Sequence, residues 1–163
     1  MLNPIRERDT IMDWIRLKPT ALDLAFSLHV PGSFRWQEQG WDAVWLSNNL
    51  KHFFTDLDRK ALGSANRRKH LHTDRLVVLH QSPNVGWHAH CQIATPQRLS
   101  QNELADLAER LWLRSLGPHA HGRFQQHLFW SEPVVGGHLP YMLGHLSKDT
   151  VDWQNTLFTC AVT

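Results

Sequence analysis

The chain has 163 residues, which indicates one domain with enough material for a core of its own. Apolar residues make up 42% and charged residues 20%, which excludes an intrinsically disordered chain, and a net charge of only +2 singles out no class of partner. Two cysteines provide neither a zinc-finger pattern nor a disulfide framework. Because no apolar run is long enough to span a membrane and the start lacks a signal-peptide pattern, we expect a cytoplasmic protein without membrane contact.

The first part of the chain is predicted to contain one strand and one helix. Residues 1–18 form an extension or a short amphipathic helix ahead of them. Apolar and polar residues alternate over 20–30, which is typical of a strand with one buried face. One face of this strand holds Leu22, Leu24, Phe26 and Leu28, and the other holds Asp23, Ser27 and His29. Apolar residues recur every three to four positions over 42–60, which indicates an amphipathic helix.

The segment that follows, residues 58–75, is basic. It contains six basic and two acidic residues, for a local net charge of +4. Its cluster Arg67, Arg68 and Lys69 is the best candidate in the chain for contact with nucleic-acid phosphates, since such contacts need lysine and arginine side chains. The alternative is that this run of charge belongs to a solvated loop.

A β-hairpin and a second helix are predicted next. Strands at 75–81 and 86–94 are separated by a short turn, so they are expected to pair as a hairpin. Ser100 and Glu103 have the spacing of a capping box, in which each residue satisfies a backbone N–H of the other. The apolar stripe that follows predicts a helix that ends at Gly117.

The last part of the chain completes the predicted fold. We expect a strand at 124–135, a short helix at 141–148 and a final strand at 156–162. Strands in hairpin order with interspersed helices indicate an α+β fold, in which one antiparallel sheet carries helices on one face. Residues 1–163 are expected to form a single domain.

Three of the twelve histidines fall on the predicted hairpin. His88 and His90 are two residues apart in one strand and therefore point to the same face. His80 and His88 lie at equal distances from the turn, which places them opposite each other. Three imidazoles on one face suit a metal ion with open positions, whereas half-buried histidines without metal are the alternative. Two further pairs with the same spacing lie where solvated side chains are expected: His70 and His72, and His119 and His121.

The only tyrosine of the chain, Tyr141, lies on the predicted short helix. His145 follows one helical turn later and Lys148 two turns later, so the three side chains share a face. A phenol beside cationic groups ionises more easily, which suits a nucleophile. The alternative is that the Tyr141 ring packs under the sheet with its hydroxyl bonded locally.

This ordered set of residues resembles the HUH endonuclease family and, within it, the nuclease domain of rolling-circle replication initiators (Rep proteins). Residues 22–28 (LDLAFSL) resemble the first motif of the family, and residues 86–93 (GWHAHCQI) resemble the second. The third motif of the family has lysine three residues after the tyrosine, where this chain has Gly144, so Lys148 is the candidate for that role. The resemblance covers roughly residues 20 to 160 and implies an RRM-like antiparallel sheet of about five strands with helices behind it.

The resemblance implies an enzyme that nicks and rejoins single-stranded DNA. Tyr141 would attack phosphorus to leave a 5′-phosphotyrosine and a free 3′-hydroxyl, and Lys148 would orient the phosphate or pair with the phenolate. His80, His88 and His90 would hold Mg²⁺ or Mn²⁺, although three neutral imidazoles favour Mn²⁺, Co²⁺ or Zn²⁺ over Mg²⁺. The implied partners are single-stranded DNA at a replication origin or hairpin and a helicase domain or protein outside this chain. The implied compartment is the bacterial cytoplasm, or the nucleus for a eukaryotic virus.

Two other functions stay open. A single-tyrosine transposase or a relaxase of the same family is one of them. The three-histidine set resembles that of a relaxase, but relaxases usually carry an N-terminal tyrosine and none precedes Tyr141. The second alternative is a noncatalytic RRM-like nucleic-acid-binding domain, which predicts binding without metal dependence. Stacking on bases is open to Trp36, Trp41 and Trp130, with core packing as the alternative, and Trp87 is expected in the core.

Overall fold

The computed structural model describes residues 13, 22–30, 42–82, 86–120, 127–134 and 157–159. Its elements follow in the order β1 (Leu24–His29), α2 (Ala43–Leu62), α3 (Ser64–Lys69), β2 (Arg75–Ser82), β3 (Gly86–Ile93), α4 (Gln101–Leu116), the 3₁₀ helix η2 (Gly117–Ala120), β4 (Phe129–Pro133) and β5 (Leu157–Thr159). None of these helices is long and apolar enough to cross a membrane. The predicted helix at 141–148 lies outside the described residues, as does the one at 1–18 apart from residue 13.

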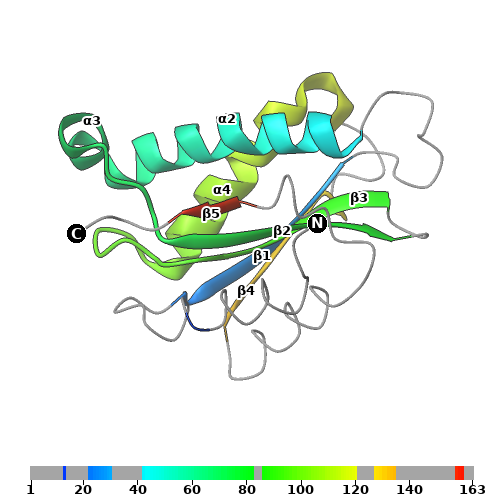
Figure 1. Ribbon diagram of the computed structural model, residues 1–163. Helices are drawn as coiled ribbons and strands as arrows, with labels where there is room; N and C mark the ends of the chain where they lie inside the picture. The colour runs from blue at the N-terminus through cyan, green and yellow to red at the C-terminus, as the bar shows by residue number, and fades with distance from the viewer. Residues whose placement is uncertain are drawn as a thin grey trace.

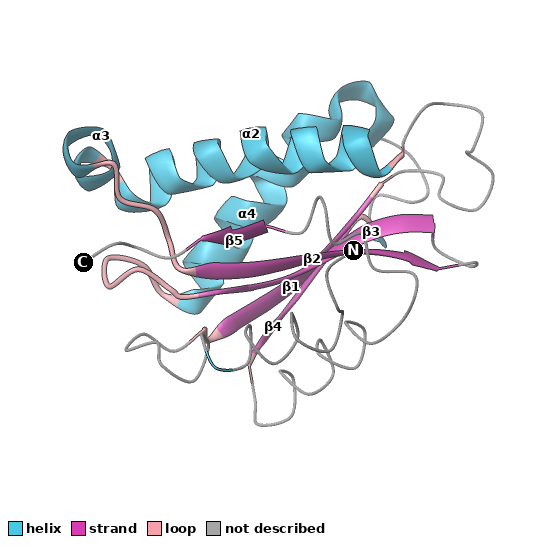
Figure 2. Ribbon diagram, in the orientation of Figure 1, coloured by secondary structure: helices cyan, strands magenta, loops and turns pink. Residues whose placement is uncertain are grey.

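The strands form one sheet in the order β4-β1-β3-β2-β5, and every neighbouring pair is antiparallel. The long strands β2 and β3 are the predicted hairpin, and β1 lies on the far side of β3 from β2. Figures 1 and 2 show that α2 and α4 lie together on one side of the sheet. The α+β class and the antiparallel hairpin predicted from the sequence are therefore confirmed.

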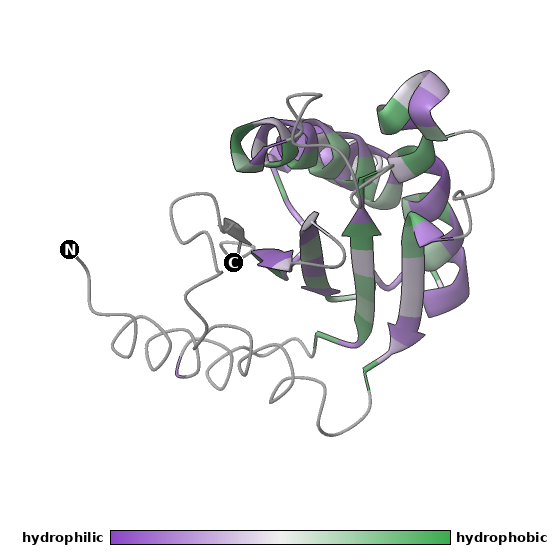
Figure 3. Cartoon of the chain, turned by 90° about the vertical axis from the view of Figure 1, so that its right-hand side faces the viewer, coloured by the Kyte–Doolittle hydropathy of each residue, from purple (hydrophilic) through white to green (hydrophobic). Residues whose placement is uncertain are grey.

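The alternation along β1 separates a helix-facing side from the opposite side of the sheet. Leu24, Phe26 and Leu28 are buried in the core beneath the helices. The Phe26 ring stacks on Phe129 at a centroid distance of 5.7 Å and meets Phe53 of α2 edge-on at 6.3 Å. Along α2 and α4, hydrophobic and hydrophilic stretches alternate in colour (Figure 3), as expected of helices with one buried face.

Capping groups define where the two long helices begin. The Asp42 carboxylate accepts a hydrogen bond of 2.8 Å from the Trp45 backbone N–H at the start of α2. At the start of α4, the Ser100 hydroxyl accepts from the Glu103 N–H, and the Glu103 carboxylate accepts from the Ser100 N–H. This is the predicted capping box, and it satisfies N–H groups that have no partner inside the helix.

The basic segment 58–75 contains the end of α2, the short helix α3 and a loop at 70–74, so the cluster Arg67, Arg68 and Lys69 lies on a helix, where all three side chains are exposed to solvent. Asp58 of α2 is buried and accepts hydrogen bonds from the Thr73 backbone and hydroxyl and from the Arg75 guanidinium at 2.8 Å. The Arg75 guanidinium also lies 4.4 Å from the centre of the Phe54 ring. This buried ion pair ties the end of α2 to the first residue of β2.

The predicted strand at 124–135 is shorter in the structure, because β4 begins at Phe129 and the described residues 127–128 precede it. The extent of β1 explains why β4 begins at Phe129. The pairing between the two strands starts with Leu28 and Phe129, one residue before the end of β1. The final strand, predicted at 156–162, is described only over β5, which pairs with the start of β2.

Candidate metal centre

The strand order places three histidines side by side in one row across the sheet. His80 of β2 pairs with His88 of β3, and His29 of β1 pairs with the same His88 from the other side. In the neighbouring row on the same face, Ser27 of β1 pairs with His90 of β3. The pairing of His80 with His88 confirms the register predicted from the length of the turn.

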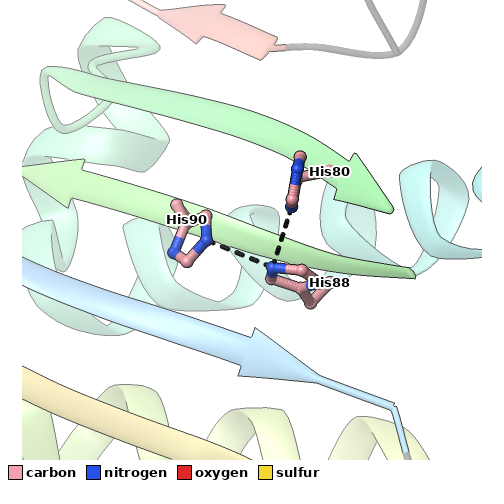
Figure 4. Close-up of side chains that lie close together, drawn as sticks. All are labelled: His80, His88 and His90. Atoms are coloured by element: carbon pink, nitrogen blue, oxygen red, sulfur yellow. Dashed lines mark hydrogen bonds between the residues drawn. The ribbon is translucent and has the colours of Figure 1, made fainter. Parts of the chain in front are cut away.

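The side chains of His80, His88 and His90 converge on one another (Figure 4). His88 Nε2 lies 3.2 Å from His80 Nδ1 and 3.2 Å from His90 Nε2. One nitrogen from each ring lies within 4.8 Å of the other two. Two nitrogens that bind one ion at roughly 2.0–2.1 Å with an angle of about 100° are about 3.2 Å apart. Both pairs that include His88 therefore have a spacing compatible with metal ligands, and the trio could hold a divalent ion.

Neighbouring groups orient two of the three rings. The Gly86 carbonyl accepts a hydrogen bond of 3.0 Å from His88 Nδ1, which leaves the Nε2 lone pair of His88 for an ion. The Ser27 hydroxyl lies 2.9 Å from His90 Nδ1, and when Nδ1–H donates to it the Nε2 lone pair of His90 is likewise available. Both contacts are the kind that metal-binding histidines commonly make with their second nitrogen.

Burial favours the neutral imidazoles that a metal site needs. His80 and His88 are each only 5% exposed, and His90 is half-buried. Burial lowers the pKa of His88 below its ordinary value, while the hydrogen bond to the Gly86 carbonyl acts in the opposite direction. A neutral ring carries the lone pair that binds a cation, so His88 needs little proton release before it binds an ion.

His29 is a fourth histidine of the site, and the pattern of the sequence did not single it out as a ligand. Its ring is parallel to that of His88, with an interplanar angle of 3° and a centroid distance of 5.2 Å. Burial, followed by the nearby His88 and His127, lowers its pKa to about 4, so it is neutral at physiological pH. The alternation of β1 predicts that Ser27 and His29 share one face, but only the pairing of β1 with β3 brings that face to the trio.

Several predicted site residues are not part of this cluster as described. The candidate nucleophile Tyr141 and its companions His145 and Lys148 lie outside the described residues. Arg67, Arg68 and Lys69 are exposed on α3, which the loop at 70–74 separates from Arg75 at the start of β2. His80 lies five residues into that strand, roughly 17 Å further along at about 3.3 Å per residue, so α3 lies towards the opposite end of β2 from the trio.

The remaining predicted residues divide between the core and the surface. His72 Nδ1 lies 3.0 Å from the buried Asp58 carboxylate, so it belongs to the Asp58–Arg75 cluster. Trp87 is partly buried and packs against the core, as expected. Trp130 of β4 is 50% exposed and does not pack in the core. His121, Trp36 and Trp41 lie outside the described residues.

Comparison with known proteins adds no further information, since the chain matches no protein-family model, no curated protein and no solved structure.

Proposed function

We propose that the chain is a metal-dependent nuclease that nicks and rejoins single-stranded DNA through a covalent bond to Tyr141, as in the initiation of rolling-circle replication. The observation that carries this proposal is the convergence of His80, His88 and His90 on one face of an antiparallel sheet. Three imidazole ligands, two of them with oriented rings, leave coordination positions open on a divalent ion, which suits a site that must admit a phosphate.

The topology supports the proposal. The order β1-α2-β2-β3-α4-β4, with the sheet order β4-β1-β3-β2, is a split β-α-β arrangement, and β5 extends it beyond β2. This arrangement is compatible with the RRM-like sheet that the resemblance to HUH endonucleases implies. The face opposite α2 and α4 carries the histidines, so the site and the hydrophobic core occupy different sides of the same strands.

The proposed reaction is an exchange of phosphodiester bonds in which no water is consumed. The Tyr141 oxygen forms a bond to phosphorus as the phenol gives up its proton, and the bond from phosphorus to the 3′-oxygen of the preceding nucleotide breaks. That 3′-oxygen takes up a proton, and the reverse transfer rejoins the ends. A divalent ion, when bound, polarises the phosphate and stabilises charge on a nonbridging oxygen. Lys148 orients the phosphate or pairs with the phenolate.

The basic surface of α3 would contact a different part of the DNA. Because α3 lies towards the far end of β2 from the trio, we propose that Arg67, Arg68 and Lys69 bind phosphates outside the nicked segment. Replacing all three by alanine should weaken DNA binding and reduce its salt dependence, by about 0.7 in the logarithmic slope for each lost single-strand phosphate contact. Metal binding should not change.

The proposal is tested by looking for a covalent adduct. The protein is incubated with pools of single-stranded DNA and Mn²⁺, and denaturing gels report a protein–DNA band. We expect the band for the wild type and none for Tyr141→Phe, which should still bind DNA. An adduct that persists in Tyr141→Phe would refute the assigned nucleophile.

The role of the trio is tested with a matched pair of histidine variants. His88→Ala should abolish both the adduct and the binding of Mn²⁺, Co²⁺ or Zn²⁺ measured by calorimetry. His52→Ala removes an exposed histidine of α2 and should leave both unchanged. DNA binding that is independent of metal and of Tyr141, with no adduct, would support the noncatalytic RRM-like alternative.

A further inference from the structure

The exposed Trp130 lies in the same row of the sheet as His90. Trp130 of β4 pairs with Ser27 of β1, and Ser27 pairs with His90 of β3. Paired residues of antiparallel strands project from the same face, so the indole lies on the histidine face. The hydrogen bond of 2.9 Å between Ser27 and His90 shows that this row is continuous from β1 to the metal centre.

Few large apolar side chains in the described part of the chain are as exposed as Trp130. Only Val44, 59% exposed, and Trp130, 50% exposed, are large apolar side chains that face solvent there. Neighbouring strands are about 4.8 Å apart, so the Cα atoms of Trp130 and His90 are separated by about 10 Å. This is the length of about three stacked nucleotides at about 3.4 Å each.

The chemistry around Trp130 favours a nucleobase over a phosphate. Neither β1 nor β4 contains a lysine or arginine, and Glu132 lies one row away on the same face of β4. These two strands therefore offer a phosphate no lysine or arginine to bind. A base is neutral, and its flat surface matches an exposed indole.

We infer that Trp130 is a stacking platform for a base of the single-stranded DNA, within about three nucleotides of the phosphate held at His80, His88 and His90. This inference rests on the proposed function and names a subsite of the same face. Stacking on Trp130 would make the site selective for single-stranded DNA, because a base stacked on this indole is not available for pairing in a duplex.

The test separates bases from phosphates. Binding of a short oligothymidylate is measured by fluorescence anisotropy at fixed salt in the presence of a chelator, and it is compared with an abasic oligomer of the same length. Trp130→Ala should weaken binding to the oligothymidylate by about 5- to 150-fold, the usual effect of losing one stacked base. It should leave binding to the abasic oligomer unchanged, and Trp130→Phe should retain part of the affinity.

Val44→Ala is the matched control, since it removes the other exposed apolar side chain and should change neither affinity. Thermal unfolding of each variant confirms that it is folded. The inference would be overturned if Trp130→Ala bound the oligothymidylate as tightly as the wild type does. It would also be overturned if the substitution weakened binding to the oligothymidylate and to the abasic oligomer by the same factor. Base-dependent loss in a protein that forms no adduct supports the platform and refutes the nuclease. An adduct together with unchanged binding by Trp130→Ala refutes the platform alone.

Discussion

Replacing Ser27 by alanine removes the hydroxyl that lies 2.9 Å from His90 Nδ1 and leaves the three histidines in place. Loss of such a contact typically lowers metal affinity by 10- to 100-fold, or about 1.4–2.7 kcal/mol. With the ion at 100 times the wild-type dissociation constant, the ion stabilises the wild type by about 2.7 kcal/mol and the variant by only about 0.4–1.4 kcal/mol. At about 2–4 °C per kcal/mol for a chain of this size, a metal-induced rise in Tm of about 5–11 °C should fall to about 1–6 °C.

The assay is thermal unfolding with increasing Mn²⁺, Co²⁺ or Zn²⁺, compared in each case with chelator. Ser47→Ala is the control, because the Ser47 hydroxyl is buried in α2 and has no hydrogen-bond partner among the described residues. We expect Ser47→Ala to match the wild-type response to metal. A full wild-type response in Ser27→Ala would show that the hydroxyl does not orient His90, and a wild type that does not respond to any of these ions would refute the metal centre.

Two further predictions concern stability without metal. The pKa of His29 is about 4 in the folded protein against an ordinary 6.5, so the unfolded chain takes up a proton first as the pH falls. The metal-free protein should therefore lose up to about 3 kcal/mol between about pH 6.5 and pH 4 and no more from this group below that. Urea unfolding across this window checks the loss, which His29→Phe should reduce; an unchanged pH profile in that variant would contradict the prediction. Asp58→Ala leaves the buried Arg75 without its anion and should cost about 3–5 kcal/mol, whereas Asp56→Ala, which breaks exposed pairs, should cost less than about 1 kcal/mol. Equal costs for the two variants would show that burial does not strengthen the Asp58 pair.

Local sequence rules are enough to predict the elements that carry the site. Side chains in a strand alternate between two faces, so the spacing of His88 and His90 is sufficient to place them on one side of the sheet. A short turn leaves little freedom in the register of a hairpin, so the pairing of His80 with His88 follows from counting residues about the turn. The capping box at Ser100 and Glu103 is equally local, because both partners lie within one helical turn.

Contacts between segments far apart in the chain decided the rest. Ser27 is 63 residues from its partner His90 in the chain, and no periodicity indicates which strand lies next to β3. That choice depends on burying the shared face of β1, β2 and β3 under α2 and α4. The same choice put Trp130 in the row of His90 and made β4 begin near the end of its antiparallel partner β1. Tyr141 stays a prediction of the sequence alone. A histidine-bearing hairpin in an α+β fold could be predicted from the residues alone, because turn length and alternation act over a few residues. Only the tertiary structure added the groups that orient His90 and stack on His88, because strand order is settled by the packing of the whole core.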